Sequence, residues 1–115
     1  MSGNPILLEK DGAVAIITLN APEKKNALSR SVINLLAGVI ADVERDASIR
    51  ALLLRGEGRM FSCGGDIEEM VAAGDALSTL VDDELRVAES MIPRFASLPF
   101  PVVCAVQGVS SFSVQ

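Results

Sequence analysis

Two uninterrupted aliphatic runs constrain the fold of this chain more than any other feature. Residues 51–54 lie between two arginines, and residues 102–106 follow a proline. Runs of this length are typical of parallel strands that are buried on both faces. A segment with helical spacing of apolar residues precedes each run, so a strand-helix order occurs twice along the chain. The sequence therefore predicts an α/β fold.

The first part of the chain predicts a hairpin followed by a helix. Residues 6–10 and 13–19 have the pattern of two strands around a turn at Gly12, which can supply a positive φ. Ser29 is a good helix N-cap, and apolar residues recur after it at three- and four-residue spacing until about Asp46. A hairpin, a long helix and the strand at 51–54 together predict a ββα unit.

The second part of the chain predicts two further helices before the last strand. Asp66, with Glu69 three residues later, can form a capping box, so a helix is expected to start there with Glu68 and Glu69 on its exposed side. Apolar residues between 77 and 91 predict a longer helix. We expect Pro93 to kink this helix and residues 98–101 to end it.

Composition limits the kinds of partner. The chain has 115 residues, of which 50% are hydrophobic and 22% charged, so a single domain or part of one with a real core is expected. A net charge of −5 and the absence of Trp and Tyr disfavour nucleic-acid binding. The N-terminus lacks the pattern of a secretory leader, and no apolar stretch is long enough for a membrane span. These features predict a soluble, cytoplasmic protein with no membrane partner.

Cysteine and histidine usage excludes several chemistries. Cys63 and Cys104 lie far apart in the sequence and are expected to be reduced thiols, because their spacing suggests neither a disulfide framework nor a metal site. We expect Cys104 to belong to the core. The chain contains no histidine, which excludes Ser-His-Asp and Cys-His nucleophiles within it, and with them a serine peptidase.

Three segments in this order resemble motifs of one family: residues 20–29 (NAPEKKNALS), 61–67 (FSCGGDI) and 101–108 (PVVCAVQG). With them the chain resembles the N-terminal half of the crotonase (enoyl-CoA hydratase/isomerase) family. The resemblance implies a crotonase-like spiral of ββα units, the ClpP/crotonase fold, with residues 1–115 as an incomplete N-terminal portion of one acyl-CoA-binding domain. It also implies a homotrimer or a dimer of trimers for the full-length protein.

The resemblance further implies a reaction and a substrate class. Members of this family act on coenzyme A thioesters, and two backbone N–H groups hold the enolate-like oxyanion. By position in the motifs, Gly65 is one donor and Ser113 is the other. The implied activity is that of an enoyl-CoA hydratase or isomerase, a lyase of fatty acid metabolism. No metal and no redox cofactor is implied, because coenzyme A enters as part of the substrate.

Other positions match the family's substrate-binding segments. They are Lys25, Ala27, Leu28, Cys63, Gly64, Gly65, Asp66 and Ile67. From the residues alone, the Gly64-Gly65 pair lets a ligand approach the backbone beside a helix N-terminus, or it merely makes a turn. Lys25 either contacts phosphate or is solvated, Cys63 is a reactive thiol or a small buried side chain, and Asp66 is expected to be a helix cap.

The chain departs from the family pattern after Gly108. Phe112, Ser113 and Val114 stand where the family has glycines, and bulky or β-branched residues resist the backbone geometry of such a cluster. The catalytic glutamates of the family lie further on, so no acid or base is carried over. We therefore expect a truncated product or one part of a longer polypeptide. The alternative function is a non-catalytic remnant that binds coenzyme A thioesters or another subunit.

Overall fold

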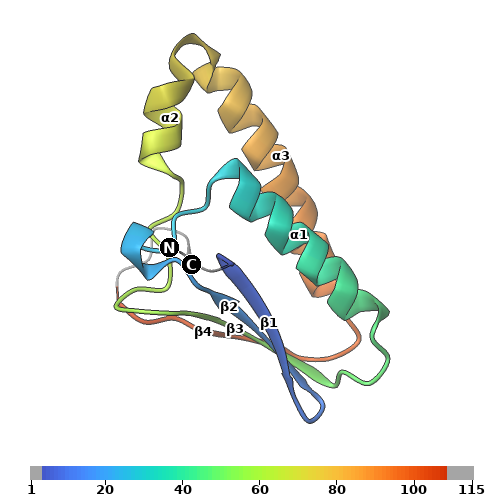
Figure 1. Cartoon of the computed structure of the whole chain (residues 1–115). Helices are drawn as coiled ribbons and strands as arrows, with labels where there is room; N and C mark the ends of the chain where they lie inside the picture. The colour runs from blue at the N-terminus through green and yellow to red at the C-terminus, as the bar shows by residue number, and fades with distance from the viewer. Residues whose placement is uncertain (1–3, 109–115) are drawn as a thin grey trace.

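The computed structural model describes residues 4–108 and shows a four-stranded sheet with helices on one face (Figure 1). The strands are β1 (Ile6–Asp11), β2 (Val14–Leu19), β3 (Ala51–Gly56) and β4 (Val102–Ala105), in that order across the sheet. The helices are α1 (Arg30–Arg45), α2 (Ile67–Ala73) and α3 (Leu77–Ala96), with short 3₁₀ turns η1 (Pro22–Lys24) and η2 (Gly74–Ala76). The α/β fold predicted from the sequence is confirmed.

The predicted hairpin and first helix are also confirmed. β1 pairs antiparallel with β2 around Gly12, whose φ is +60°. The Ser29 hydroxyl accepts a hydrogen bond from the Val32 N–H at 3.3 Å, which caps α1, and the helix ends before Asp46. The buried stripe of α1 consists of Ile33, Leu36, Ile40 and Val43.

The prediction that β3 and β4 are buried on both faces was wrong. β3 pairs in parallel with β2 and β4, and its Leu52 and Leu54 are buried against the helices. Leu53, however, points to the other face of the sheet and is only half-buried. Its partner in β4, Val103, is 55% exposed. The physical reason is that the helices in the described part of the chain cover one face only.

Cys104 is exposed, so its assignment to the core was wrong too. It lies in β4, which is the last strand of the sheet within residues 4–108 and pairs there with β3 alone. A short aliphatic strand at such an edge has the same sequence pattern as a buried central strand. Only the position of the strand in the sheet separates the two.

The N-terminus of α2 has the predicted Asp66 cap but not the reciprocal bond of a capping box. The Asp66 carboxylate accepts from the Glu69 N–H at 3.1 Å, as expected for an N-cap. The Glu69 carboxylate instead accepts from the backbone N–H of Arg30 at 3.0 Å, at the first residue of α1. Glu69 is therefore half-buried and joins two helices, whereas Glu68 is exposed as expected.

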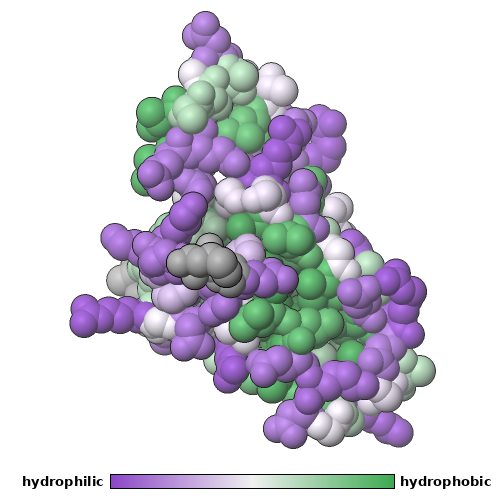
Figure 2. Space-filling model, viewed as in Figure 1, coloured by the Kyte–Doolittle hydropathy of each residue, from purple (hydrophilic) through white to green (hydrophobic). Residues whose placement is uncertain are grey.

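Helices α2 and α3 form an arm that extends from the sheet, and α3 returns along α1 (Figure 1). Pro93 lies inside α3, which continues to Ala96 before the segment 98–101. Figure 2 shows apolar surface over the α2 end of this arm, where Ile67 and Val71 are exposed. None of the helices between residues 4 and 108 is long and apolar enough to cross a bilayer.

Candidate active site

The first two sequence motifs lie side by side. The Cys63 N–H donates to the Lys25 carbonyl at 2.9 Å, and the Leu28 N–H donates to the Gly64 carbonyl at 2.7 Å. Leu28 and Gly65 also form an isolated parallel bridge. The third motif adjoins them, because the Phe61 N–H donates to the Gln107 carbonyl at 3.0 Å. Segments far apart in the sequence thus meet at one place.

Asn26 holds these loops together, which the sequence did not indicate. Its side chain is buried and its φ is +54°. The amide oxygen accepts from the Ala21 N–H at 2.8 Å. The amide nitrogen donates to the carbonyl oxygens of Glu57 at 2.9 Å, Met60 at 3.1 Å and Phe61 at 3.0 Å. Asparagine tolerates this left-handed geometry better than other side-chain-bearing residues do.

Ser62 extends this network to the glycine pair. Its hydroxyl donates to the Asn26 carbonyl at 2.8 Å and accepts from the Gly64 N–H at 3.0 Å. Ser62 is fully buried, and its bond to the Asn26 carbonyl is buried, whereas the bond from Gly64 is partly buried. Gly64 has a φ of +88°, which favours glycine. The buried network therefore sets the orientation of the backbone that leads into Gly65.

Gly65 presents its backbone to two hollows. One is a cavity of about 340 Å³ with apolar walls from Leu28, Ile33, Met70, Val81, Leu85 and Ala88. The other is a more polar cleft of about 190 Å³, lined among others by Lys24, Ala27 and Cys63. Within residues 4–108, the N–H of Gly65 donates to no other group. An unengaged donor thus lies where an apolar cavity meets a polar cleft.

Glu84 of α3 lines the same apolar cavity and is another residue that the sequence did not single out. It is 9% exposed, and its Oε1 has no hydrogen-bond partner in the described part of the chain. Burial, followed by the neighbouring Glu69 carboxyl, raises the pKa of Glu84 to about 7. The spacing of α3 offered no sign of this, because acidic residues in an amphipathic helix usually face solvent.

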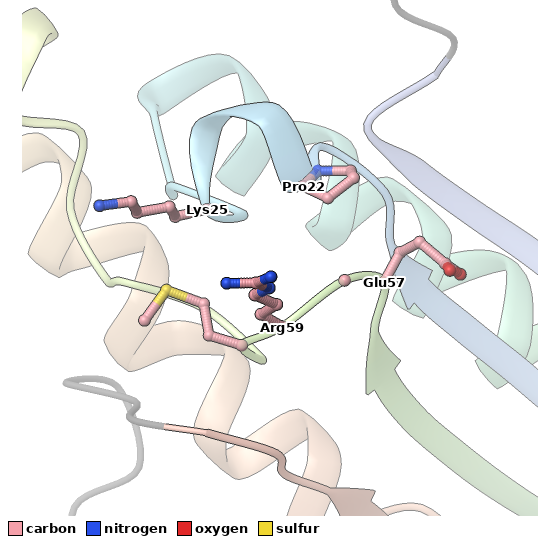
Figure 3. Close-up of a pocket in the computed structure, with 6 residues that line it drawn as sticks. Pro22, Lys25, Glu57 and Arg59 are labelled. Carbon is pink, nitrogen blue, oxygen red and sulfur yellow. The ribbon is translucent and has the colours of Figure 1, made fainter.

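A third cavity is lined by two basic side chains. Its volume is about 470 Å³, and Figure 3 shows Lys25 and Arg59 among the residues that line it, with Pro22 and Glu57. Lys25 is exposed and has a φ of +55° at the end of η1. Lys25 was predicted from the sequence as a binding residue and Arg59 was not. The fold brings both to the lining of the same cavity.

The remaining predicted site residues fall into three groups. Ala27, Leu28 and Cys63 lie at the loop contact, and Cys63 is half-buried with its Sγ 3.9 Å from the Lys24 carbonyl oxygen. Asp66 is the N-cap of α2, and Ile67 is 73% exposed. Ser113, with its neighbours Phe112 and Val114, lies outside the described residues.

Solved structures of known proteins share the fold of this chain. The structure resembles that of an enoyl-CoA hydratase/isomerase from Xanthobacter autotrophicus Py2, with a TM-score of 0.81 and 34% identity over 91% of this chain and 39% of the other. It also resembles AtuE of Pseudomonas aeruginosa, with a TM-score of 0.83 and 36% identity over 92% of this chain and 41% of the other. The fold is therefore that of the crotonases, as predicted.

The sequence comparisons lead to the family. The Enoyl-CoA hydratase/isomerase profile matches residues 9–111. The 1,2-epoxyphenylacetyl-CoA isomerase of Escherichia coli K12 is 38% identical over 92% of this chain and 41% of its own length. A probable enoyl-CoA hydratase of Bacillus subtilis is 33% identical over 93% and 40%. The chain belongs to the enoyl-CoA hydratase/isomerase family, and it spans about 40% of the length of these relatives.

Proposed function

We propose that this chain supplies the thioester-binding half of an acyl-CoA hydratase or isomerase. The thioester carbonyl lies against the N–H of Gly65, the acyl group enters the apolar cavity, and the pantetheine arm leaves through the polar cleft. The observation that carries this proposal is the unengaged Gly65 N–H at the junction of the two hollows, within the described residues. No metal and no redox cofactor takes part.

Gly65 acts as a hydrogen-bond donor to the developing oxyanion. When a proton leaves the carbon beside the carbonyl, negative charge moves to the thioester oxygen, and a preorganised N–H stabilises it without reorganisation. The buried bonds of Asn26 and Ser62 support that preorganisation. We assign little of the effect to the start of α2, because Asp66, Glu68 and Glu69 put negative charge there.

The nucleotide end of coenzyme A contacts the cationic hollow. Lys25 and Arg59 supply positive charge in a protein of net charge −5, which favours the phosphate groups of the ligand locally. Ala27 and Leu28 follow Lys25 in the chain, and Leu28 forms the bridge to Gly65. Cys63 contributes a small side chain to the cleft, and we assign no chemistry to its thiol.

The second oxyanion donor is Ser113 by position in the family motif. Loss of one such donor costs roughly 10² to 10³ in rate, and loss of an acid/base glutamate of the kind that the family carries further along the chain costs roughly 10² to 10⁴. We therefore propose that the 115 residues alone do not hydrate an enoyl-CoA measurably, and that joining them to a family-like C-terminal half restores turnover. A homotrimer or a dimer of trimers is proposed for that longer protein.

Calorimetric titration with butyryl-CoA tests this function. The 115-residue chain should bind butyryl-CoA more tightly than free coenzyme A, because only the thioester fills the apolar cavity. Equal affinities, or no binding, would contradict the proposal. The 115 residues joined to a family-like C-terminal half provide a further test. If that folded protein binds butyryl-CoA but does not turn over crotonyl-CoA, the non-catalytic alternative is favoured.

A further inference from the structure

We propose that Glu84 is an acid/base group of this site, which takes a proton from the acyl chain of the bound thioester and returns it. The inference rests on the proposed function, because it requires a thioester whose acyl group occupies the cavity beside Gly65. No family motif led to Glu84. Its position in the folded chain alone singles it out.

The geometry of the cavity supports this role. The other walls of the cavity are apolar side chains and the Gly64-Gly65 backbone, so Glu84 is the one ionisable group among its lining residues. Its Oε1 is buried and has no hydrogen-bond partner within residues 4–108. A buried polar atom without a partner is costly, and native proteins rarely keep one without a use. Here the missing partner is supplied by the ligand.

The surrounding charges keep both protonation states of Glu84 accessible. Burial disfavours its carboxylate, and Glu69 and Asp66 of the α2 segment do so further. Arg30 of α1 acts in the opposite direction, and this guanidinium also pairs with Asp83 on α3. The resulting pKa is about 7. A proton-transfer group works best when its pKa lies near the working pH.

The proposed step needs no further reactant. The Glu84 carboxylate removes a proton from the carbon next to the thioester carbonyl. The C–H electron pair becomes the enolate double bond, and the carbonyl π pair moves to the oxygen that faces the Gly65 N–H. The Glu84 acid then trades this proton for one from solvent water and delivers the new one to the same carbon, which is exchange. With a 3-enoyl thioester it returns the proton two carbons further along, which moves the double bond.

Butyryl-CoA in D₂O isolates this step. The ligand has no double bond to hydrate, so NMR loss of its C2 proton signals reports proton removal alone. The wild-type chain should exchange these protons faster than buffer does, and Glu84→Gln should lower the enzymatic rate by roughly 10² or more. Glu89→Gln is the matched control, because Glu89 is an exposed carboxylate on the same helix.

A second readout does not depend on activity. Filling the cavity removes more water from Glu84 and shifts it part of the way towards its neutral form. Because a group with a pKa of about 7 is about half protonated at pH 7, butyryl-CoA binding should be accompanied by uptake of less than about half a proton, and the remaining carboxylate serves as the base. Titrations in two buffers of different ionisation enthalpy measure this uptake. Glu89→Gln should retain it, and Glu84→Gln should lose it.

The outcomes separate the two claims. Faster exchange and proton uptake that both depend on Glu84 support the inference. Butyryl-CoA binding with exchange at the buffer rate, or with equal exchange in Glu84→Gln and the wild type, would overturn the inference and leave the proposed function standing. A wild-type chain that does not bind butyryl-CoA would refute the proposed function, and the inference with it.

Discussion

Replacing Asn26 with alanine should weaken the whole loop assembly behind the site. The change removes one buried acceptor for Ala21 and two amide hydrogens that are shared among three carbonyl oxygens. It also places alanine at a φ of +54°. At about 1 kcal/mol per hydrogen bond and about 1 kcal/mol for the left-handed backbone, the free energy of unfolding should fall by about 4 kcal/mol.

Urea unfolding followed by circular dichroism at one protein concentration measures this loss. Asn20→Ala is the matched control, because the Asn20 side chain makes one exposed bond, to the Asn4 carbonyl at 3.2 Å. Asn20→Ala should lower the free energy of unfolding by no more than about 0.5 kcal/mol. Asn26→Gly separates the two contributions, since glycine keeps the left-handed backbone and removes only the hydrogen bonds.

The expected order of stability is wild type, Asn20→Ala, Asn26→Gly and then Asn26→Ala. Butyryl-CoA affinity should follow the same order. The Asn26 side chain fixes the position of its own backbone carbonyl, which accepts from the Ser62 hydroxyl, and that hydroxyl in turn accepts from the Gly64 N–H. An Asn26→Ala protein that is as stable as Asn20→Ala and binds equally well would show that this network does not organise the site.

Three other predictions concern pH, charge and the open face of the sheet. Because the pKa of Glu84 is raised from 4.5 to about 7, the folded state binds more protons than the unfolded state between these values, so stability should fall as pH rises through that window. Urea midpoints across it should lose part of this slope in Glu84→Gln, and an unchanged slope would count against the assignment. Lys25→Ala and Arg59→Ala should each raise the Kd for butyryl-CoA by roughly fivefold and reduce its salt dependence, measured by calorimetry. Lys10→Ala is the control, because the Lys10 ammonium pairs with Asp46, and it should change neither quantity. Equal effects of all three substitutions would show that Lys25 and Arg59 do not contact the ligand. β4 is an edge strand of the sheet within residues 4–108, and its Val103 is exposed, so we expect the 115 residues to self-associate through it. Val103→Lys should reduce this self-association in analytical ultracentrifugation, because it adds charge to that strand; an unchanged distribution would mean that association uses another surface.

Local patterns predicted the elements because the responsible contacts are local. The turn at Gly12 joins adjacent strands, and the caps at Ser29 and Asp66 bond to N–H groups three residues later. The burial of Leu53 and Val103 could not be predicted, since it depends on which face of the sheet the helices cover. An aliphatic run has the same sequence pattern in either position.

The candidate site was predictable only where a single segment carries it. Gly64 and Gly65 stand out as a glycine pair before a helix. Asn26 acquires its role from carbonyl groups 31 to 35 residues away, and Glu84 from the packing of α3 against the cavity. Long-range contacts of this kind leave no periodicity or spacing in the sequence. The resemblance to a family did not reveal these residues either.

The role of the Gly65 N–H is tested by the carbonyl stretch of bound butyryl-CoA, measured by infrared difference spectroscopy in the wild type, Gly65→Pro and Gly65→Ala. Proline removes the N–H, and the φ of Gly65 lies outside the left-handed region. Alanine keeps the N–H, and its Cβ would lie 2.5 Å from Met70 Cε, the movable end of a flexible side chain. If the Gly65 N–H polarises the thioester carbonyl, the stretch should lie below that of free ligand in the wild type and in Gly65→Ala, and it should return to the free value in folded Gly65→Pro. A bound ligand with an unshifted carbonyl in the wild type, or with the same shift in Gly65→Pro, would contradict this role.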